Sequence, residues 1–118
     1  MTNGTLAMIT CPILEDEMIY SILNDPEDKR IYLLRNKNTS TLVPKLEHHN
    51  IDYINIDEKD FLKGTVRIAD DGYSIVIWMM DLGLHSDPKH LGEAIRDELT
   101  RIDGRVDGVA LYYGLCGN

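Results

Sequence analysis

The chain has 118 residues, of which 43% are hydrophobic and 27% charged, an ordinary balance for one globular domain with its own core. Its formal net charge of −8, with 12 scattered lysines and arginines, argues against binding to nucleic acid or to an anionic membrane surface. No apolar stretch approaches the about eighteen residues of a membrane span, and the amino terminus lacks a signal-peptide pattern. We therefore expect a cytoplasmic protein whose two cysteines stay reduced.

The first predicted element is a buried strand over residues 5–11, which is dominated by apolar side chains. Pro12 follows it directly and suits the first turn of a helix, where its missing N–H is no loss. Three acidic residues then lie near the helix amino end, where negative charge is favoured. We expect this helix to end at residues 24–26 and to bury an apolar stripe of Leu14, Met18, Ile19, Ile22 and Leu23.

The middle third contains shorter and weaker patterns. Residues 30–35 are typical of a short strand, and residues 41–49 of a helix with Leu42, Val43 and Leu46 facing inward. Residues 51–56 alternate apolar and polar side chains, which predicts another strand. A short helical turn over 57–63 and an irregular connection then lead to residue 73.

The strongest strand prediction covers residues 73–80, which are almost wholly apolar and should form the centre of the sheet. A loop over 81–85 follows, and Asp87 and Pro88 are typical of a helix start. The buried face of this helix is expected to consist of Leu91, Ile95, Leu99 and Ile102. A final strand begins near Gly108.

Helices that alternate with apolar strands predict an α/β fold. We expect a three-layer, mainly parallel open sheet with right-handed crossover helices, formed by residues 1–118 as a single domain.

Three metal-ligating residue types follow predicted strands: Cys11 follows the first strand, His85 the central strand and Cys116 the last strand. Sites in open parallel sheets gather beyond the carboxyl ends of the strands, so we expect these residues to meet at one edge. Two thiolates and an imidazole suit zinc or another thiophilic metal, with a fourth position for water, substrate or another residue. Glu17 could orient one ligand from the first helix, although its ordinary role is helix-end charge.

Other interpretations of the same residues stay open. Cys11 or Cys116 could be the nucleophile of a thiol enzyme with His85 as base, but the three acidic residues after Cys11 oppose formation of its thiolate. Alternatively, both cysteines are core residues of a non-catalytic partner module. No catalytic residue is assigned.

The glycine-rich end of the chain provides a further candidate site. Gly114, Gly117 and Asn118 could bind a cofactor or an anion, although the lysine and the following helix of a phosphate loop are missing. His48, His49 and His90 are expected on exposed helix faces, and residues 78–80 in the core.

Three motifs span most of the chain: residues 11–17 contain C-x-x-L-x-x-E, residues 81–88 contain D-x-x-L-H-x-x-P, and residues 113–118 read Y-G-L-C-G-N. In these motifs the chain resembles an uncharacterised prokaryotic family of unknown function that is common in methanogenic archaea and other anaerobes. The matching motif positions are Cys11, His85, Cys116 and, more weakly, Glu17.

The resemblance implies a role beside corrinoid-dependent methyltransferase systems, in methyl transfer or one-carbon metabolism. Zinc, iron or a corrinoid would then be the cofactor, and a corrinoid protein or a methyltransferase the partner. Members of the family usually continue past Y-G-L-C-G-N, so this sequence resembles their amino-terminal half. An open sheet of this kind also favours a homo-oligomer.

Overall fold

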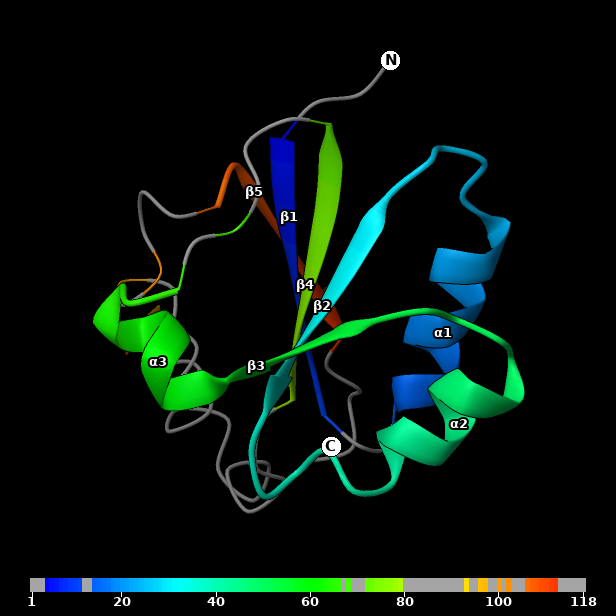
Figure 1. Ribbon diagram of the computed structural model, residues 1–118, viewed down its shortest axis with the longest axis horizontal. Helices are drawn as coiled ribbons and strands as arrows, with labels where there is room; N and C mark the ends of the chain where they lie inside the picture. The colour runs from blue at the N-terminus through cyan, green and yellow to red at the C-terminus, as the bar shows by residue number, and fades with distance from the viewer. Residues whose placement is uncertain are drawn as a thin grey trace.

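The computed structural model describes residues 4–11, 14–66, 68, 72–79, 93, 96–97, 100, 102 and 106–112. Strands and helices alternate along most of this chain (Figure 1), as the sequence predicts. In chain order the elements are β1 (Gly4–Thr10), α1 (Glu15–Asn24), β2 (Arg30–Arg35), α2 (Leu42–His48), β3 (Ile54–Asp57), α3 (Glu58–Lys63), β4 (Tyr73–Met79) and β5 (Gly108–Tyr112).

The five strands form one open sheet in the order β3-β2-β4-β1-β5, and every pairing is parallel. This confirms the predicted α/β fold with a parallel sheet. β4 lies between β2 and β1, as expected for the most apolar strand, because a central strand is covered by neighbours on both edges and by helices on both faces.

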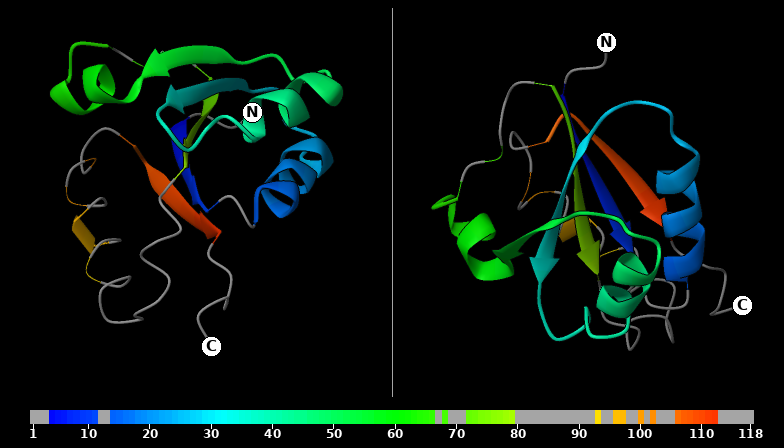
Figure 2. Two further views of the ribbon diagram at one scale, coloured as in Figure 1. Left: turned by 90° about the horizontal axis from the view of Figure 1, so that it is seen from below. Right: turned by 45° about the vertical axis from the view of Figure 1, so that its right-hand side comes forward.

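The helices cover both faces of the sheet (Figure 2). α1 and α2 pack on one face, while α3 and the helical residue Ile102 pack on the other. The chain moves from β1 through β2 to β3 in one direction across the sheet and then returns to β4 and β5 in the other. Because crossovers are right-handed, this reversal of direction transfers the later helices to the opposite face.

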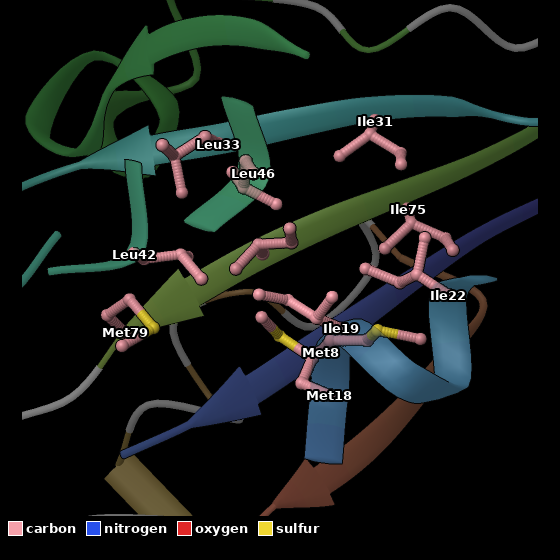
Figure 3. Close-up of a cluster of buried hydrophobic side chains, with 11 residues drawn as sticks. Met8, Met18, Ile19, Ile22, Ile31, Leu33, Leu42, Leu46, Ile75 and Met79 are labelled. Atoms are coloured by element: carbon pink, nitrogen blue, oxygen red, sulfur yellow. The ribbon is translucent and has the colours of Figure 1, made fainter. Parts of the chain in front are cut away.

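Eleven buried side chains fill the core between the sheet and the helices α1 and α2 (Figure 3). β4 contributes alternate residues to it, and the helices contribute their apolar stripes. Burial of each Leu, Ile or Met side chain stabilises the fold by about 1.5–3 kcal/mol. The residues are Met8, Met18, Ile19, Ile22, Ile31, Leu33, Leu42, Leu46, Ile75, Ile77 and Met79.

The opposite face of the sheet carries a second core. Val76 and Trp78 of β4 point to this side, because successive side chains of a strand alternate between faces. Phe61 of α3 and Ile102 cover them, and Ile102 is the one described residue of the stripe predicted over 91–102. The described residues Glu93, Arg96, Asp97, Thr100 and Ile102 are helical, in agreement with the helix predicted there.

The helix α1 begins at Glu15, after a turn in which the N–H of Leu14 donates to the carbonyl of Cys11. Pro12, which the sequence places in the first turn, lies outside the described residues. One predicted detail of α1 is wrong, because Leu23 does not join the buried stripe and is 49% exposed. Met18, Ile19 and Ile22 face the sheet, and the next position lies about 100° further around the helix, toward solvent.

The third strand also begins later than predicted. β3 starts at Ile54 instead of Ile51, because the end of α2 continues into a turn. Asn50 has a positive φ of 57°, and the N–H of Ile51 donates to the carbonyl of Leu46. Ile51 therefore packs against the core from a turn. Among the described residues, no helix is long and apolar enough to cross a membrane.

Candidate site at the carboxyl edge of the sheet

Three strands end level at the carboxyl edge of the sheet. Thr10, the last residue of β1, pairs with Met79 of β4 on one side and with Tyr112 of β5 on the other. Met79 and Tyr112 are themselves the last residues of their strands. The ends of β1, β4 and β5 therefore lie side by side, since neighbouring strands lie about 4.8 Å apart.

The register between β1 and β5 is fixed at the other end of these two strands, where both begin. The carboxylate of Asp107 accepts a hydrogen bond from the N–H of Thr5 at 2.7 Å, and the N–H of Asp107 donates to the carbonyl of Thr5 at 2.7 Å. Asp107 directly precedes β5, so it fixes the start of β5 beside the start of β1. A slip of β5 along β1 would break both hydrogen bonds.

Cys11 is the first residue after β1 and is completely buried, with 0% exposure. Its thiol is free and makes no hydrogen bond to any residue that the structure describes. Its carbonyl accepts hydrogen bonds from the hydroxyl of Thr10 at 3.1 Å and from the N–H of Leu14 at 3.0 Å. These two contacts hold the turn that leads from β1 into α1.

His85 and Cys116 lie outside the described residues, as do Gly114, Gly117 and Asn118. Within the described part of the chain, no group of three or more His, Cys, Asp and Glu side chains could hold a metal ion.

The remaining predicted residues are on the surface or in the core. Glu17 lies on the exposed side of α1. His48 and His49 are exposed as predicted, and Trp78 and Met79 are buried as predicted. His90 and Met80 lie outside the described residues.

The topology makes this edge suitable for a site. β1 continues into α1 on one face of the sheet, whereas β4, its neighbour, continues toward Ile102 on the other face. Where adjacent strands lead to opposite faces, a crevice opens beyond their carboxyl ends, and ligands of open α/β sheets bind there. Cys11 follows directly on one of the two strands.

An ion pair between a buried carboxylate and a partly exposed lysine joins α1 to α2 at this edge. Glu15, only 2% exposed, lies 2.8 Å from Nζ of Lys45 through Oε1 and accepts a hydrogen bond from the hydroxyl of Thr41 at 3.1 Å through Oε2. Asp16 lies 3.0 Å from the same ammonium. The hydrogen bonds to Glu15 and then to Asp16 raise the pKa of Lys45 above 10.5, against the opposing effect of burial.

A second polar cluster lies where β2, β3 and β4 end. Oε2 of Glu58 accepts hydrogen bonds from the indole N–H of Trp78 at 2.5 Å and from the side-chain amide of Asn36 at 2.8 Å. The same amide group donates to the carbonyl of Met79 at 3.0 Å. Asn36 therefore fixes the end of β4, the strand that leads toward His85.

Neither cluster was predicted from the sequence, because their members are far apart in the chain. Glu15 is 30 residues from Lys45, and Glu58 is 20 residues from Trp78. From the sequence alone, the acidic start of α1 indicates only helix-end charge. A weak signal was present, because Glu15 falls on the same helix face as Met18, Ile19 and Ile22 and was therefore bound to be buried.

Fold and edge together define an open-sheet α/β protein with a buried thiol directly after β1, at the carboxyl edge of the sheet. Residues 79–118 match the model of a family described as a protein of unknown function, DUF1638. That range contains the sequences at 81–88 and 113–118 but not the one at 11–17. No curated protein and no solved structure matches the chain.

Proposed function

We propose that the protein binds a thiophilic metal ion at the carboxyl edge of the sheet, through Cys11, His85 and Cys116. One observation carries this proposal: Thr10 pairs with both Met79 and Tyr112. His85 is six residues after Met79, and Cys116 is four residues after Tyr112. At about 3.5 Å per extended residue, these segments can span up to about 21 Å from the end of β4 and about 14 Å from the end of β5, so both are long enough for their side chains to reach the end of β1.

The donor set fits zinc or iron. Thiolate sulfur and imidazole nitrogen are the ligands that these metals prefer, and the buried thiol of Cys11 makes no competing hydrogen bond to a described residue. A bound ion of this kind would act as a Lewis acid at its open position. Both cysteine thiols must lose their protons when the metal binds, so the affinity of the protein for the metal should rise with pH.

The cellular context that we propose is corrinoid-dependent methyl transfer or one-carbon metabolism in the cytoplasm. It is supported by the resemblance in three motifs, two of which fall inside the range matched by the family model. In this context the partner is a corrinoid protein or a methyltransferase. A corrinoid is then the alternative cofactor, and Gly114, Gly117 and Asn118 would contact it.

The complete burial of Cys11 favours a second candidate function over a thiol enzyme. A nucleophilic thiol must reach its substrate, whereas a completely buried cysteine commonly acts as a small core hydrophobe. The second candidate is therefore a non-catalytic partner module with structural cysteines. It predicts no bound metal.

Metal analysis of anaerobically purified protein tests the proposal. We expect about one equivalent of zinc or iron in the wild type and a loss of most of it in Cys11→Ser, His85→Ala and Cys116→Ser. His49→Ala is the matched control, because His49 is exposed at the end of α2 and should keep the metal.

Cobalt substitution gives a second readout that does not depend on activity. Thiolate ligation of cobalt produces a strong ligand-to-metal charge-transfer absorption band. This band should weaken when either cysteine is replaced by serine. A metal-free wild type, or full metal content in both His85→Ala and Cys116→Ser, would contradict the proposal. The structural-cysteine alternative would then be favoured.

A further inference from the structure

One face of α1 is not covered by any described element. The side chains of Tyr20 and Leu23 are 69% and 49% exposed on it, so two large apolar residues of α1 lie at the surface. We call this face the α1 outer stripe. It consists of Asp16, Glu17, Tyr20, Leu23 and Asn24, which follow one another at helical spacing.

The α1 outer stripe combines an acidic end with an apolar end. Asp16 and Glu17 lie in the first turn, and α1 contains no basic residue. Asp16 is paired with Lys45 but keeps 74% of its side chain exposed, and Glu17 forms no ion pair with any described residue. A shallow hollow of about 450 Å³, open to solvent, is lined by Asp16, Glu17, Tyr20 and Ser21.

We propose that the α1 outer stripe is the docking surface for a partner protein that presents lysine or arginine beside an apolar patch. Glu17 would pair with the basic group, and the ring of Tyr20 can receive the same cation on its face. Leu23 would pack against the apolar patch. Tyrosine is among the residues that contribute most at interfaces, because it buries a large area at low entropic cost.

The charge of the stripe favours a basic partner protein over a second copy of the chain, nucleic acid or anionic lipid. A second copy of the chain would bring Asp16 and Glu17 against the same carboxylates or against another part of a chain that carries −8 overall. Like charges in contact cost free energy, so self-association through this face is disfavoured. The same negative charge repels nucleic acid and anionic lipid. A basic protein surface is complementary to the stripe.

The stripe also has a defined position in the fold. Its acidic end is the amino end of α1, which begins four residues after Cys11 at the carboxyl edge of the sheet. A partner docked there would lie beside that edge. The docking does not require a metal at Cys11, so the two proposals can fail independently.

Titration with a basic probe tests the inference. The probe is a synthetic lysine–leucine peptide designed as an amphipathic helix, added to the full ¹⁵N-labelled chain. We expect amide shifts concentrated in residues 16–24 and an affinity that falls with salt. Shifts spread evenly over the acidic residues of the whole chain would overturn the inference, because they would indicate attraction by net charge alone.

Two charge reversals separate a docking surface from net charge. Glu17→Lys and Glu27→Lys each change the net charge equally, and both residues are exposed. Glu27 lies in the turn between α1 and β2, beyond the end of the helix and ten residues from Glu17. We expect Glu17→Lys to lower the affinity for the peptide by about fivefold, and Glu27→Lys to lower it by less than about twofold. Equal effects would overturn the inference.

The apolar half of the stripe has its own test. Tyr20→Ser should lower the affinity for the peptide by about fivefold, while the net charge and the metal content stay unchanged. Sedimentation of the wild type checks the alternative occupant. A dimer that Tyr20→Ser dissociates would show that a second copy covers this face and would overturn the inference.

Discussion

The carboxylate of Glu15 lies 2.8 Å from Nζ of Lys45, and this contact joins the start of α1 to α2. The two partners are in different environments: the Glu15 side chain is only 3% exposed, whereas that of Lys45 is 37% exposed. A buried carboxylate depends on its partners to offset the loss of water, while an ammonium at the surface keeps part of its hydration. The pair therefore holds the start of α1, and with it the turn at Cys11.

Removal of the lysine should destabilise the protein. Lys45→Met keeps the aliphatic part of the side chain but leaves Glu15, among the described residues, with the hydroxyl of Thr41 as its one partner. We expect a loss of about 1–2 kcal/mol of unfolding free energy, less than for a fully buried pair because Lys45 is partly solvated. Urea unfolding measures it. Lys63→Met, at an exposed position on α3, is the control, and an equal effect of both variants would contradict this account.

Alkaline pH should weaken the fold through two groups. The hydrogen bonds to Glu15 and Asp16 raise the pKa of Lys45 above 10.5, while burial and then the charge of Glu47 raise the pKa of Tyr53 above 10.0. A raised pKa in the folded chain stabilises it below the unfolded value, and this stabilisation is lost as pH rises through the folded pKa. The unfolding free energy should therefore fall above about pH 10.

The double variant Lys45→Met, Tyr53→Phe tests this assignment. Its unfolding free energy should decrease less than that of the wild type between about pH 9 and about pH 11.5. The matched double control is Lys63→Met, Tyr20→Phe, which removes an exposed ammonium and an exposed phenol. If the double variant Lys45→Met, Tyr53→Phe showed the same pH dependence as the wild type, the loss of unfolding free energy at alkaline pH would arise from other groups.

The strands were predictable because burial is recorded locally in the sequence. All residues of β4 after Tyr73 are buried, and the apolar run over 73–80 predicts a central strand without any knowledge of its partners. β3 carries less information, because an edge strand has one partner and exposes part of its surface. Ile54 is accordingly half exposed, and the sequence places the start of β3 three residues too early.

Contacts between distant residues were not predictable in the same way. The pattern of apolar residues cannot show that Thr10 pairs with both Met79 and Tyr112, because strand order depends on the packing of the whole sheet. The expectation that strand ends gather at one edge follows from the parallel topology alone and holds for β1, β4 and β5. The partners of Glu15 and Glu58 required the structure.

Loss of the Glu58 carboxylate should destabilise the opposite side of the same edge. Glu58→Leu removes the acceptor of the Trp78 indole and of the Asn36 amide, and unpaired buried donors cost about 1–3 kcal/mol. Glu58→Gln retains an acceptor and should cost about half as much. Trp78 is the single tryptophan, so its fluorescence reports both the unfolding transition and any new contact with water. Asp60→Asn on α3 is the control.

Loss of the Asn36 amide should have a related but more local effect. Asn36→Ala releases the carbonyl of Met79 and removes one of the two donors to Glu58. We expect a loss of about 1 kcal/mol and faster amide exchange near the end of β4. Asn55→Ala, at an exposed position of β3, is the control. Unchanged exchange near Met79 would show that the end of β4 does not depend on this contact.

The burial of Cys11 predicts that its thiol is protected in the folded chain. In Cys116→Ser, Cys11 is the single cysteine, and alkylation by iodoacetamide should proceed only through opening of the structure. We expect a rate at least about a hundredfold below that of a free thiol, and full reaction in denaturant. The protection should persist after chelation, because 0% exposure arises from the protein itself. Rapid alkylation in the folded, metal-free chain would show that Cys11 is accessible and would revive the thiol-enzyme hypothesis.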